Sequence, residues 1–338
     1  MQYKNIEIHG AAELIECEDG GVRWLRVPRS VYDAMENDHG KKMCYNNTGI
    51  ELRFVVKGDK AKIRLASATG LDTVLHYNVF FGGVQGGWNT FGEGGVLFGK
   101  EFELVIDKPA DIDLLRKVSC DSDYDWDPEV VRVIINRGLF KIMDVEGDVC
   151  PPTKEQMPKN TILAYGSSIT HGSNAIAKSN SWASMTAHRF NADLINLGIP
   201  GSCCMEPMLV DYIARLGEEG RWNTAILELG INVLRWEIPM IYERVSNTLE
   251  QIAGRNSDKR IYVISPVYCS ADYHKEDSAE KWRSTIESIV KEKSYENVEY
   301  INGLDLLSHV SGLTADLVHP NIYGIEKIAD GLAKRIKI

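Results

Sequence analysis

The chain has 338 residues, of which 44% are hydrophobic and 25% are charged, and its formal net charge is −10. This length predicts two domains in a globular protein, each large enough to bury its own core. The acidic balance argues against nucleic acid or an anionic membrane as a partner, because both favour basic surfaces. No stretch reaches the roughly 18 consecutive apolar residues of a membrane span.

The seven cysteines show neither C-x-x-C pairs nor the Cys/His spacing of a metal site. They therefore predict free thiols and no bound metal. The first ten residues lack the apolar segment of a signal peptide. Together these features predict a cytoplasmic protein, because a reducing compartment keeps thiols unpaired.

Residues 1–150 show the two-residue period of β-strands. Apolar residues alternate over 52–56 and again over 61–65, and the turn residues 57–60 between them predict a hairpin. The same alternation recurs over 74–81, 102–106 and 131–135. No amphipathic helix is evident between these runs, so we expect an all-β, jelly-roll-like sandwich domain.

Two stretches of this first half resemble ligand-binding loops. The glycine-rich run 82–95 lacks the Gly-Lys-Ser/Thr ending of a phosphate loop, so we expect an inter-strand loop, with Trp88 and Phe91 as an alternative sugar-stacking platform. The run 121–127 begins like a calcium loop but has Trp126 where that loop needs glycine. It is expected to be a solvated acidic turn.

Residues 151–160 contain three prolines and few apolar residues, which is typical of a linker. From residue 161 to 338 strands and helices alternate. Strands are expected at 162–165, 192–197, 224–229, 260–264 and 298–301, and helices with one apolar stripe over 205–216, 239–252 and 325–336. Repeated strand–helix units predict a parallel sheet covered by helices on both faces.

Two polar blocks of this second half could perform nucleophilic catalysis. Ser168 follows the first strand, which places its hydroxyl at the carboxyl edge of the sheet, where ligands bind in open α/β folds. Asp316 and His319 precede the last helix and could supply a base and the carboxylate that orients it. We therefore predict a Ser168–His319–Asp316 triad.

An ester hydrolase also needs N–H donors for the oxyanion that develops during the reaction. Gly201 and Asn232 follow the second and third strands. Gly201 could offer a backbone N–H and Asn232 a side-chain amide, and the N–H of Ser168 would complete the set.

The blocks Gly166-Ser-Ser168, Gly201, Gly230-x-Asn232 and Asp316-x-x-His319 occur in an order that resembles the SGNH (GDSL-type) hydrolase family over residues 160–338. The resemblance implies a three-layer α/β/α, flavodoxin-like domain and ester hydrolysis through an acyl-serine intermediate. It also implies Ser168 as nucleophile, Gly201 and Asn232 in the oxyanion hole, and no cofactor.

The sequence departs from the family pattern at two positions that lie outside the triad. Ser167 replaces the usual Asp of Gly-Asp-Ser, and Val233 replaces the acidic residue after Asn232. The hydrogen bonds that brace these two loops must therefore differ from the family's.

Three further side chains are candidates for the substrate pocket. His171 follows the nucleophile by one helical turn, Trp182 begins a helix, and Trp236 follows the asparagine block. For each of them a buried structural role is the alternative.

A β-sandwich in front of an SGNH domain resembles bacterial carbohydrate esterases. We therefore expect a serine esterase that removes short O-acyl groups, chiefly acetyl, from a small-molecule or oligosaccharide ester. No Leu/Phe/Met-rich loop that could hold a fatty chain is apparent. The alternatives are a lysophospholipase or thioesterase, and a carbohydrate-binding protein with a silent hydrolase domain. The sandwich could instead make a homodimer.

Overall fold

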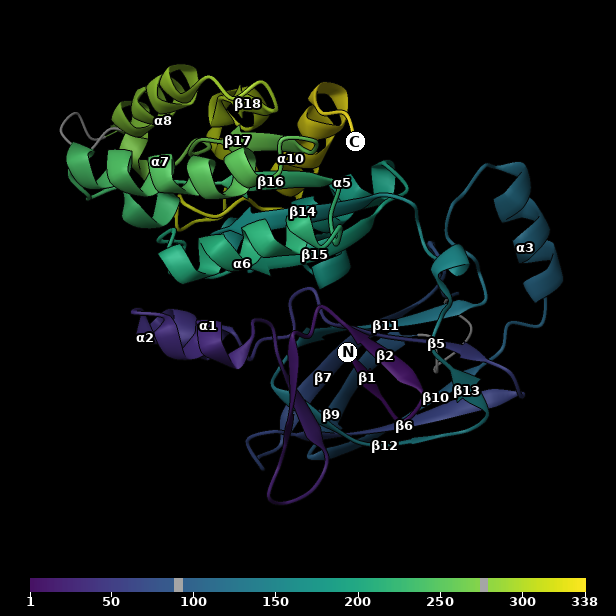
Figure 1. Ribbon diagram of the computed structural model, residues 1–338. Coiled ribbons are helices and arrows are strands. Elements are labelled where there is room, and N and C mark those ends of the chain that lie inside the picture. Colours follow the sequence, from purple (N-terminus) through teal and green to yellow (C-terminus); the bar gives the residue numbers. More distant parts are fainter. Residues whose placement is uncertain (88–93, 274–278) are drawn as a thin grey trace.

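The computed structural model describes residues 1–87, 94–273 and 279–338. A β-sandwich formed by the first half of the chain lies against an α/β unit formed by the second half (Figure 1). The alternative platform of Trp88 and Phe91 falls outside the described residues.

The sandwich consists of two antiparallel sheets. The first has the order β1-β2-β5-β11-β7-β8, with β13 joined to β5 and β9 to β7, and the second has the order β10-β6-β12-β4-β3. The first sheet's strands are β1 (Gln2–Tyr3), β2 (Ile6–His9), β5 (Glu51–Val56), β7 (Thr73–Phe81), β8 (Val84–Gln85), β9 (Gly94–Gly99), β11 (Val130–Arg137) and β13 (Val149–Cys150). Those of the second are β3 (Glu13–Glu16), β4 (Val22–Leu25), β6 (Lys60–Ser67), β10 (Glu101–Asp107) and β12 (Phe140–Glu146).

The predicted hairpin of β5 and β6 is wrong, although both strands exist. β5 pairs with β2, β11 and β13, whereas β6 pairs with β10 and β12, so the turn between them crosses from one sheet to the other. The alternating apolar residues of both strands face the same core, where Phe54 and Ile63 are fully buried. An alternating pattern shows which face of a strand is buried, but it does not show which strand pairs with it.

The described residues of the first half also include three helices, which corrects the expectation of an all-β segment. They are α1 (Arg29–Ala34), α2 (Asp38–Met43) and α3 (Ile112–Asp121). α1 and α2 have six residues each, too few to display a helical period, and they depend on tertiary packing. Val31 of α1 packs into the core of the α/β unit, beside α6.

The acidic run 121–127 is likewise only partly the solvated turn that was expected. Asp121 is the last residue of α3, and Trp126 is 3% exposed in a small core with Val55 and Val130. The guanidinium of Arg132 lies 4.0 Å from the Trp126 ring centroid. Trp126 therefore serves packing and a cation–π contact.

The α/β unit is built on a parallel sheet of order β15-β14-β16-β17-β18, which confirms the predicted fold class. All five strands lie within one residue of their expected limits: β14 (Thr161–Gly166), β15 (Asp193–Gly198), β16 (Thr224–Glu228), β17 (Arg260–Ile264) and β18 (Val298–Ile301). The accuracy has a physical reason, because strands buried on both faces are continuous apolar runs with sharp polar ends.

Helices cover both faces of this sheet (Figure 1). Leu163 and Tyr165 of β14 face α6 (Pro207–Glu218), α7 (Ile238–Arg255) and α8 (Ala279–Lys293), as the shared core cluster shows. The alternate residues Ile162 and Ala164 face α5 (Trp182–Arg189) and α10 (Ile322–Arg335). The short helices α4 (Ser168–His171) and α9 (Gly303–Leu306) follow β14 and β18. Within the described ranges, no helix combines the length and apolarity of a membrane span.

Buried polar contacts join the two halves of the chain. Arg53 of β5 makes two hydrogen bonds to the carboxylate of Asp193, at 2.6 and 2.9 Å. Arg26 donates from one nitrogen to the carbonyls of Asn196 and Gly198, at the end of β15. These contacts hold the sandwich against β15, the strand that precedes the predicted oxyanion loop.

Candidate active site

Ser168 is the first residue of α4, directly after β14. The hydroxyl of Ser167 caps this short helix by accepting a hydrogen bond from the N–H of Ile169 at 3.1 Å. The turn requires a glycine at 166, because a Cβ atom there would lie 2.2 Å from the Thr170 hydroxyl and 2.6 Å from Oε2 of Glu228. This packing fixes the position of Ser168 at the edge of the sheet.

Glu228 braces the loop that carries Ser167. Its Oε2 accepts hydrogen bonds from the N–H and the hydroxyl of Ser167, at 2.8 and 2.7 Å, and from the hydroxyl of Thr170 at 3.0 Å. The side chain ends β16 and is 3% exposed. Burial raises the pKa of Glu228, and the hydrogen bonds from Ser167 and Thr170 oppose that rise.

The structure brings together the three residues of the predicted triad. The hydroxyl of Ser168 lies 2.6 Å from Nε2 of His319, and Nδ1 of His319 lies 2.7 Å from Oδ2 of Asp316. A carboxylate only accepts, so the proton of a neutral imidazole belongs on Nδ1, which leaves Nε2 free to take the serine proton. The His319 side chain is 25% exposed, open to substrate at the sheet edge.

Asp316 is held in place by its own chain. Its Oδ1 accepts from the N–H groups of Val318 and His319 and from the hydroxyl of Thr314, at 2.9, 3.0 and 2.7 Å. Leu317 between them has a φ of 57°, the left-handed conformation that this tight turn requires. Partial burial would raise the pKa of Asp316, but the donors of His319, Val318 and Thr314 outweigh it and keep that pKa below its usual range.

Three N–H donors lie at the adjoining carboxyl ends of β14, β15 and β16. The N–H groups of Ser168 and Gly201 and the side-chain amide of Asn232 have no acceptor within the residues that the structure describes. The carbonyl of that amide accepts from the N–H of Cys203 at 3.0 Å, which fixes its orientation. The departure at Val233 places an apolar side chain, 2% exposed, in the core.

The first half of the chain contributes to the rim of this site. A Cβ atom on Gly201 would lie 3.4 Å from Cδ2 of His39, an exposed residue of α2. Two residues earlier, Asn37 caps α2 and accepts a hydrogen bond from the hydroxyl of Ser202 at 3.2 Å. α2 thus lies over the oxyanion loop.

Two of the three pocket candidates, Trp182 and His171, are buried, and the third, Trp236, is half-buried. Trp182 is 1% exposed in the core beside α10, so it is a core residue rather than a pocket wall. Trp236 packs against the core under α6 and α7 and is half-buried. His171 is 4% exposed, and its Nε2 has no hydrogen-bond partner within the described part of the chain.

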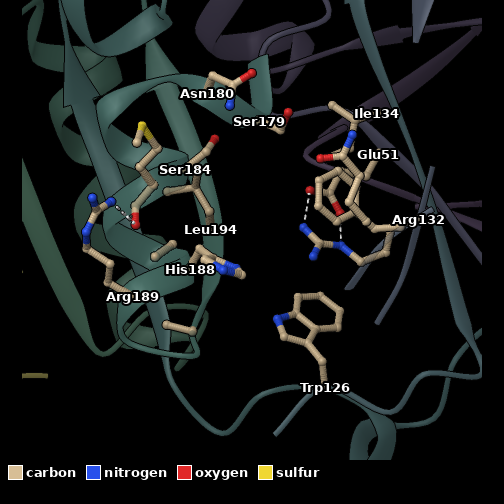
Figure 2. Close-up of a pocket in the computed structure, with 15 residues that line it drawn as sticks. Glu51, Trp126, Arg132, Ile134, Ser179, Asn180, Ser184, His188, Arg189 and Leu194 are labelled. Carbon is tan, nitrogen blue, oxygen red and sulfur yellow. Dashed lines mark hydrogen bonds and ion pairs between the residues drawn. The ribbon is translucent and has the colours of Figure 1, made fainter. Parts of the chain in front are cut away.

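A cavity of about 360 Å³ lies between α5 and the sandwich, away from the triad (Figure 2). His188 and Arg189 of α5 line one wall, and Trp126 and Arg132 line the other. Two hydrogen bonds of 2.6 and 2.7 Å join Arg132 to the carboxylate of Glu51, so the charge of this arginine is matched inside the cavity. Over the described residues, no group of three or more His, Cys, Asp and Glu could hold a metal.

The sequence interpretation missed Glu228 and His39. A signal existed for Glu228, because a single carboxylate ends an otherwise apolar buried strand. No local pattern marks His39, whose place depends on how the two halves of the chain dock.

The family comparison matches residues 159–337 to the GDSL-like Lipase/Acylhydrolase family. A search of the curated proteins found no match. Among solved structures, a salicylyl-acyltransferase, SsfX3, from a tetracycline biosynthetic pathway is 17% identical, with a TM-score of 0.76 over 97% of this chain and 93% of its own.

Two carbohydrate esterases share the arrangement of both halves. A family two carbohydrate esterase from Clostridium thermocellum, in complex with cellohexaose, is 13% identical with a TM-score of 0.61 over 98% of each chain. An acetyl xylan esterase from the rumen bacterium Butyrivibrio proteoclasticus is 12% identical with a TM-score of 0.58 over 99% of this chain and 95% of its own. At these identities the likeness establishes the fold. The family match over more than half of the sequence, with Ser168, His319 and Asp316 in contact, shows that the chain belongs to the GDSL-like lipase/acylhydrolase family of ester hydrolases.

Proposed function

We propose that this protein removes short acyl groups, chiefly acetyl, from carbohydrate esters through an acyl-serine intermediate. The observation that carries the proposal is the continuous contact from the Ser168 hydroxyl through His319 to Asp316. A serine hydroxyl is a weak nucleophile until a base removes its proton, and this geometry supplies that base.

In the first half of the reaction, Ser168 attacks the ester carbonyl while His319 takes its proton. The N–H groups of Ser168 and Gly201 and the amide of Asn232 stabilise the negative charge on the carbonyl oxygen. His319 then gives the proton to the leaving sugar hydroxyl, the carbon–oxygen bond breaks, and the acyl group stays on Ser168.

In the second half, His319 takes a proton from water, and the resulting hydroxide attacks the acyl-serine. Collapse of the second tetrahedral intermediate releases the acid and returns the proton to Ser168. Asp316 holds the imidazole in one tautomer and stabilises its positive charge at both stages.

The carbohydrate part of the proposal is supported by the esterases that match both halves of the chain, one of which is described in complex with cellohexaose. Since α2 reaches over Gly201, the first half of this chain could contact the sugar as well. The N-terminal sandwich is thus proposed to take part in substrate recognition.

The test is an acetate-release assay across acetylated xylo-, manno- and gluco-oligosaccharides, with Ser168→Ala as the inactive control. We expect release from at least one of them, and a fall in rate from acetyl to octanoyl in a series of 4-nitrophenyl esters. Rates that rise toward octanoyl would support the lysophospholipase or thioesterase alternative. Sugar binding without any acetate release would support a silent hydrolase domain.

A further inference from the structure

A second cavity lies between the two halves of the chain, on the side of α4 that faces the sandwich. Its volume is about 600 Å³. His171 and Lys178 form one wall, and the sandwich side supplies three more cations. These are Arg23 of β4, Lys42 of α2, and Arg137 at the end of β11, and no carboxylate lines the cavity.

Within the part of the chain that the structure describes, the four basic side chains around this cavity have no carboxylate partners. Neither Arg23, Lys42, Arg137 nor Lys178 forms an ion pair within the described residues, although the chain has 48 Asp and Glu against 38 Lys and Arg. In the cavity of Figure 2, by contrast, Arg132 is paired with Glu51. A site that gathers unmatched positive charge in an acidic protein is suited to an anion.

Lys178 is the most constrained of these groups. Its ammonium lies 3.2 Å from Nδ1 of His171 and donates to the carbonyls of His171 and Gly172, at 3.3 and 3.2 Å. Burial, with the charges of Arg26 and Arg137, lowers the pKa of Lys178 to about 7. A bound anion would reverse this effect, because it favours the charged ammonium.

Two elements connect this cavity to the triad. In α4, His171 follows Ser168 by three residues, a rise of about 5 Å. In α2, Lys42 follows His39 of the oxyanion rim by the same three residues. The cavity therefore adjoins the two elements that carry the nucleophile and the oxyanion rim, and our proposal places the sugar part of the ester there.

We propose that this cavity, the cationic cavity, binds an anionic group on the alcohol part of the ester, so that the preferred substrate is an acylated acidic sugar. The inference rests on the proposed function, because it assigns the sugar to this side of Ser168. A carboxylate, a sulfate and a phosphate share the required chemistry, since each offers oxygen acceptors to Arg and Lys. A neutral sugar would leave the four cations unmatched.

The test compares mono-O-acetylated methyl glucuronoside with the matched methyl glucoside, and adds the glucoside 6-sulfate and 6-phosphate to distinguish the three anions. The readout is the ratio of kcat/KM for the charged ester to that for the neutral one. Because both esters are measured with the same enzyme, a general loss of activity leaves this ratio unchanged. Arg137→Gln and Lys42→Gln each remove one cation from the cavity. The matched control is Arg260→Gln, because Arg260 lies at the amino end of β17 and does not line the cavity.

We expect at least one charged ester to exceed the neutral one by tenfold or more, through a lower KM. Arg137→Gln and Lys42→Gln should each reduce this ratio at least threefold, Arg260→Gln should keep it, and 0.5 M salt should lower it through screening. Equal kcat/KM for charged and neutral esters would overturn the inference and leave the proposed function standing. Absence of acetate release from every sugar would overturn both.

Discussion

Asp316 illustrates how a half-exposed carboxylate can still orient a base. Three donors from residues 314, 318 and 319 hold one of its oxygens, and the other faces Nδ1 of His319. The turn that supplies the donors ends at Asn321, which caps α10 through the N–H groups of Tyr323 and Gly324. The base is thus positioned by local hydrogen bonds that depend little on the rest of the molecule.

Replacing the carboxylate of Asp316 should test its role in orienting His319 while the nucleophile Ser168 stays in place. In Asp316→Asn the amide can donate to Nδ1, which favours the tautomer that cannot accept the serine proton. We expect kcat for 4-nitrophenyl acetate to fall by about three to four orders of magnitude. Thr314→Val removes one of the donors to Asp316 and serves as the milder control. A kcat within tenfold of wild type for Asp316→Asn would contradict this role.

Some contacts of single residues could be predicted from the sequence, and others could not. Ser168 and His319 could be identified from the strand end and the Asp-x-x-His block, because local sequence sets both turns. The position of Glu228 at the end of an apolar strand was a signal, but its contacts were not predictable, because its partners Ser167 and Thr170 lie 61 and 58 residues earlier and meet it only when β14 and β16 pair.

At the scale of elements, the critical contact is the seating of α4 on the end of β15. A Cβ atom on Gly198 would lie 2.4 Å from the backbone nitrogen of His171 and 2.8 Å from its Cα. Both are backbone atoms, so the clash cannot be relieved by a side-chain rotation. The position of Ser168 therefore depends on a glycine in the neighbouring strand.

Gly198→Ala should displace α4 and with it the nucleophile. We expect a loss of about 1–3 kcal/mol in the free energy of unfolding, the usual cost of overpacking, together with a lower kcat. Urea titration and 4-nitrophenyl acetate kinetics measure the two effects. Gly58→Ala is the control, because its Cβ would meet Asp148 at an ordinary 3.6 Å. If Gly198→Ala and Gly58→Ala behaved alike, the packing account of α4 would fail.

Elements were predictable where one local rule decides them. The parallel strands follow from apolar runs, whereas the pairing of β5 and β6 depends on which sheet each joins. α1 and α2 were not predicted, because they are too short to show a helical period and are stabilised by packing against the other half of the chain.

For the whole molecule, the contact between the two halves determines both stability and the shape of the site. Its centre is the buried Arg53, which contacts Asp193 of the α/β unit and Glu51 of the sandwich. Arg53 is fully buried, and Asp193 is 9% exposed. Sequence alone could not reveal this pair, because its members lie 140 positions apart and neither stands in a motif.

Removal of Arg53 should leave two buried carboxylates without their shared partner. We expect Arg53→Met to lower the free energy of unfolding by about 3–5 kcal/mol, as breaking a buried pair does elsewhere. Arg64→Met is the matched control, because Arg64 is half-exposed and pairs with Asp144 on the surface, where a loss of about 0–1 kcal/mol is expected. Equal losses in urea titrations of the two variants would refute a stabilising role for the buried pair.

The same cluster predicts how stability depends on acid pH. Burial would raise the pKa of Glu51, but the charges of Arg132 and Arg53 lower it to about 2. Its ordinary pKa in the unfolded chain is about 4.3. The carboxylate therefore contributes stability that is complete above about pH 4.3 and is lost as the pH falls through about 2. Unfolding free energies from pH 6 to pH 2 should fall less steeply for Glu51→Gln than for wild type; parallel curves would contradict the shift.

The central claim is that Ser168 is the nucleophile and that His319 activates it. Mass spectrometry of the protein after treatment with a fluorophosphonate probe tests this most directly. We predict one adduct, on the peptide that contains Ser168, and its loss together with esterase activity in His319→Ala and Ser168→Ala. An active enzyme that acquires no adduct at Ser168, or acquires it on another residue, would contradict the account.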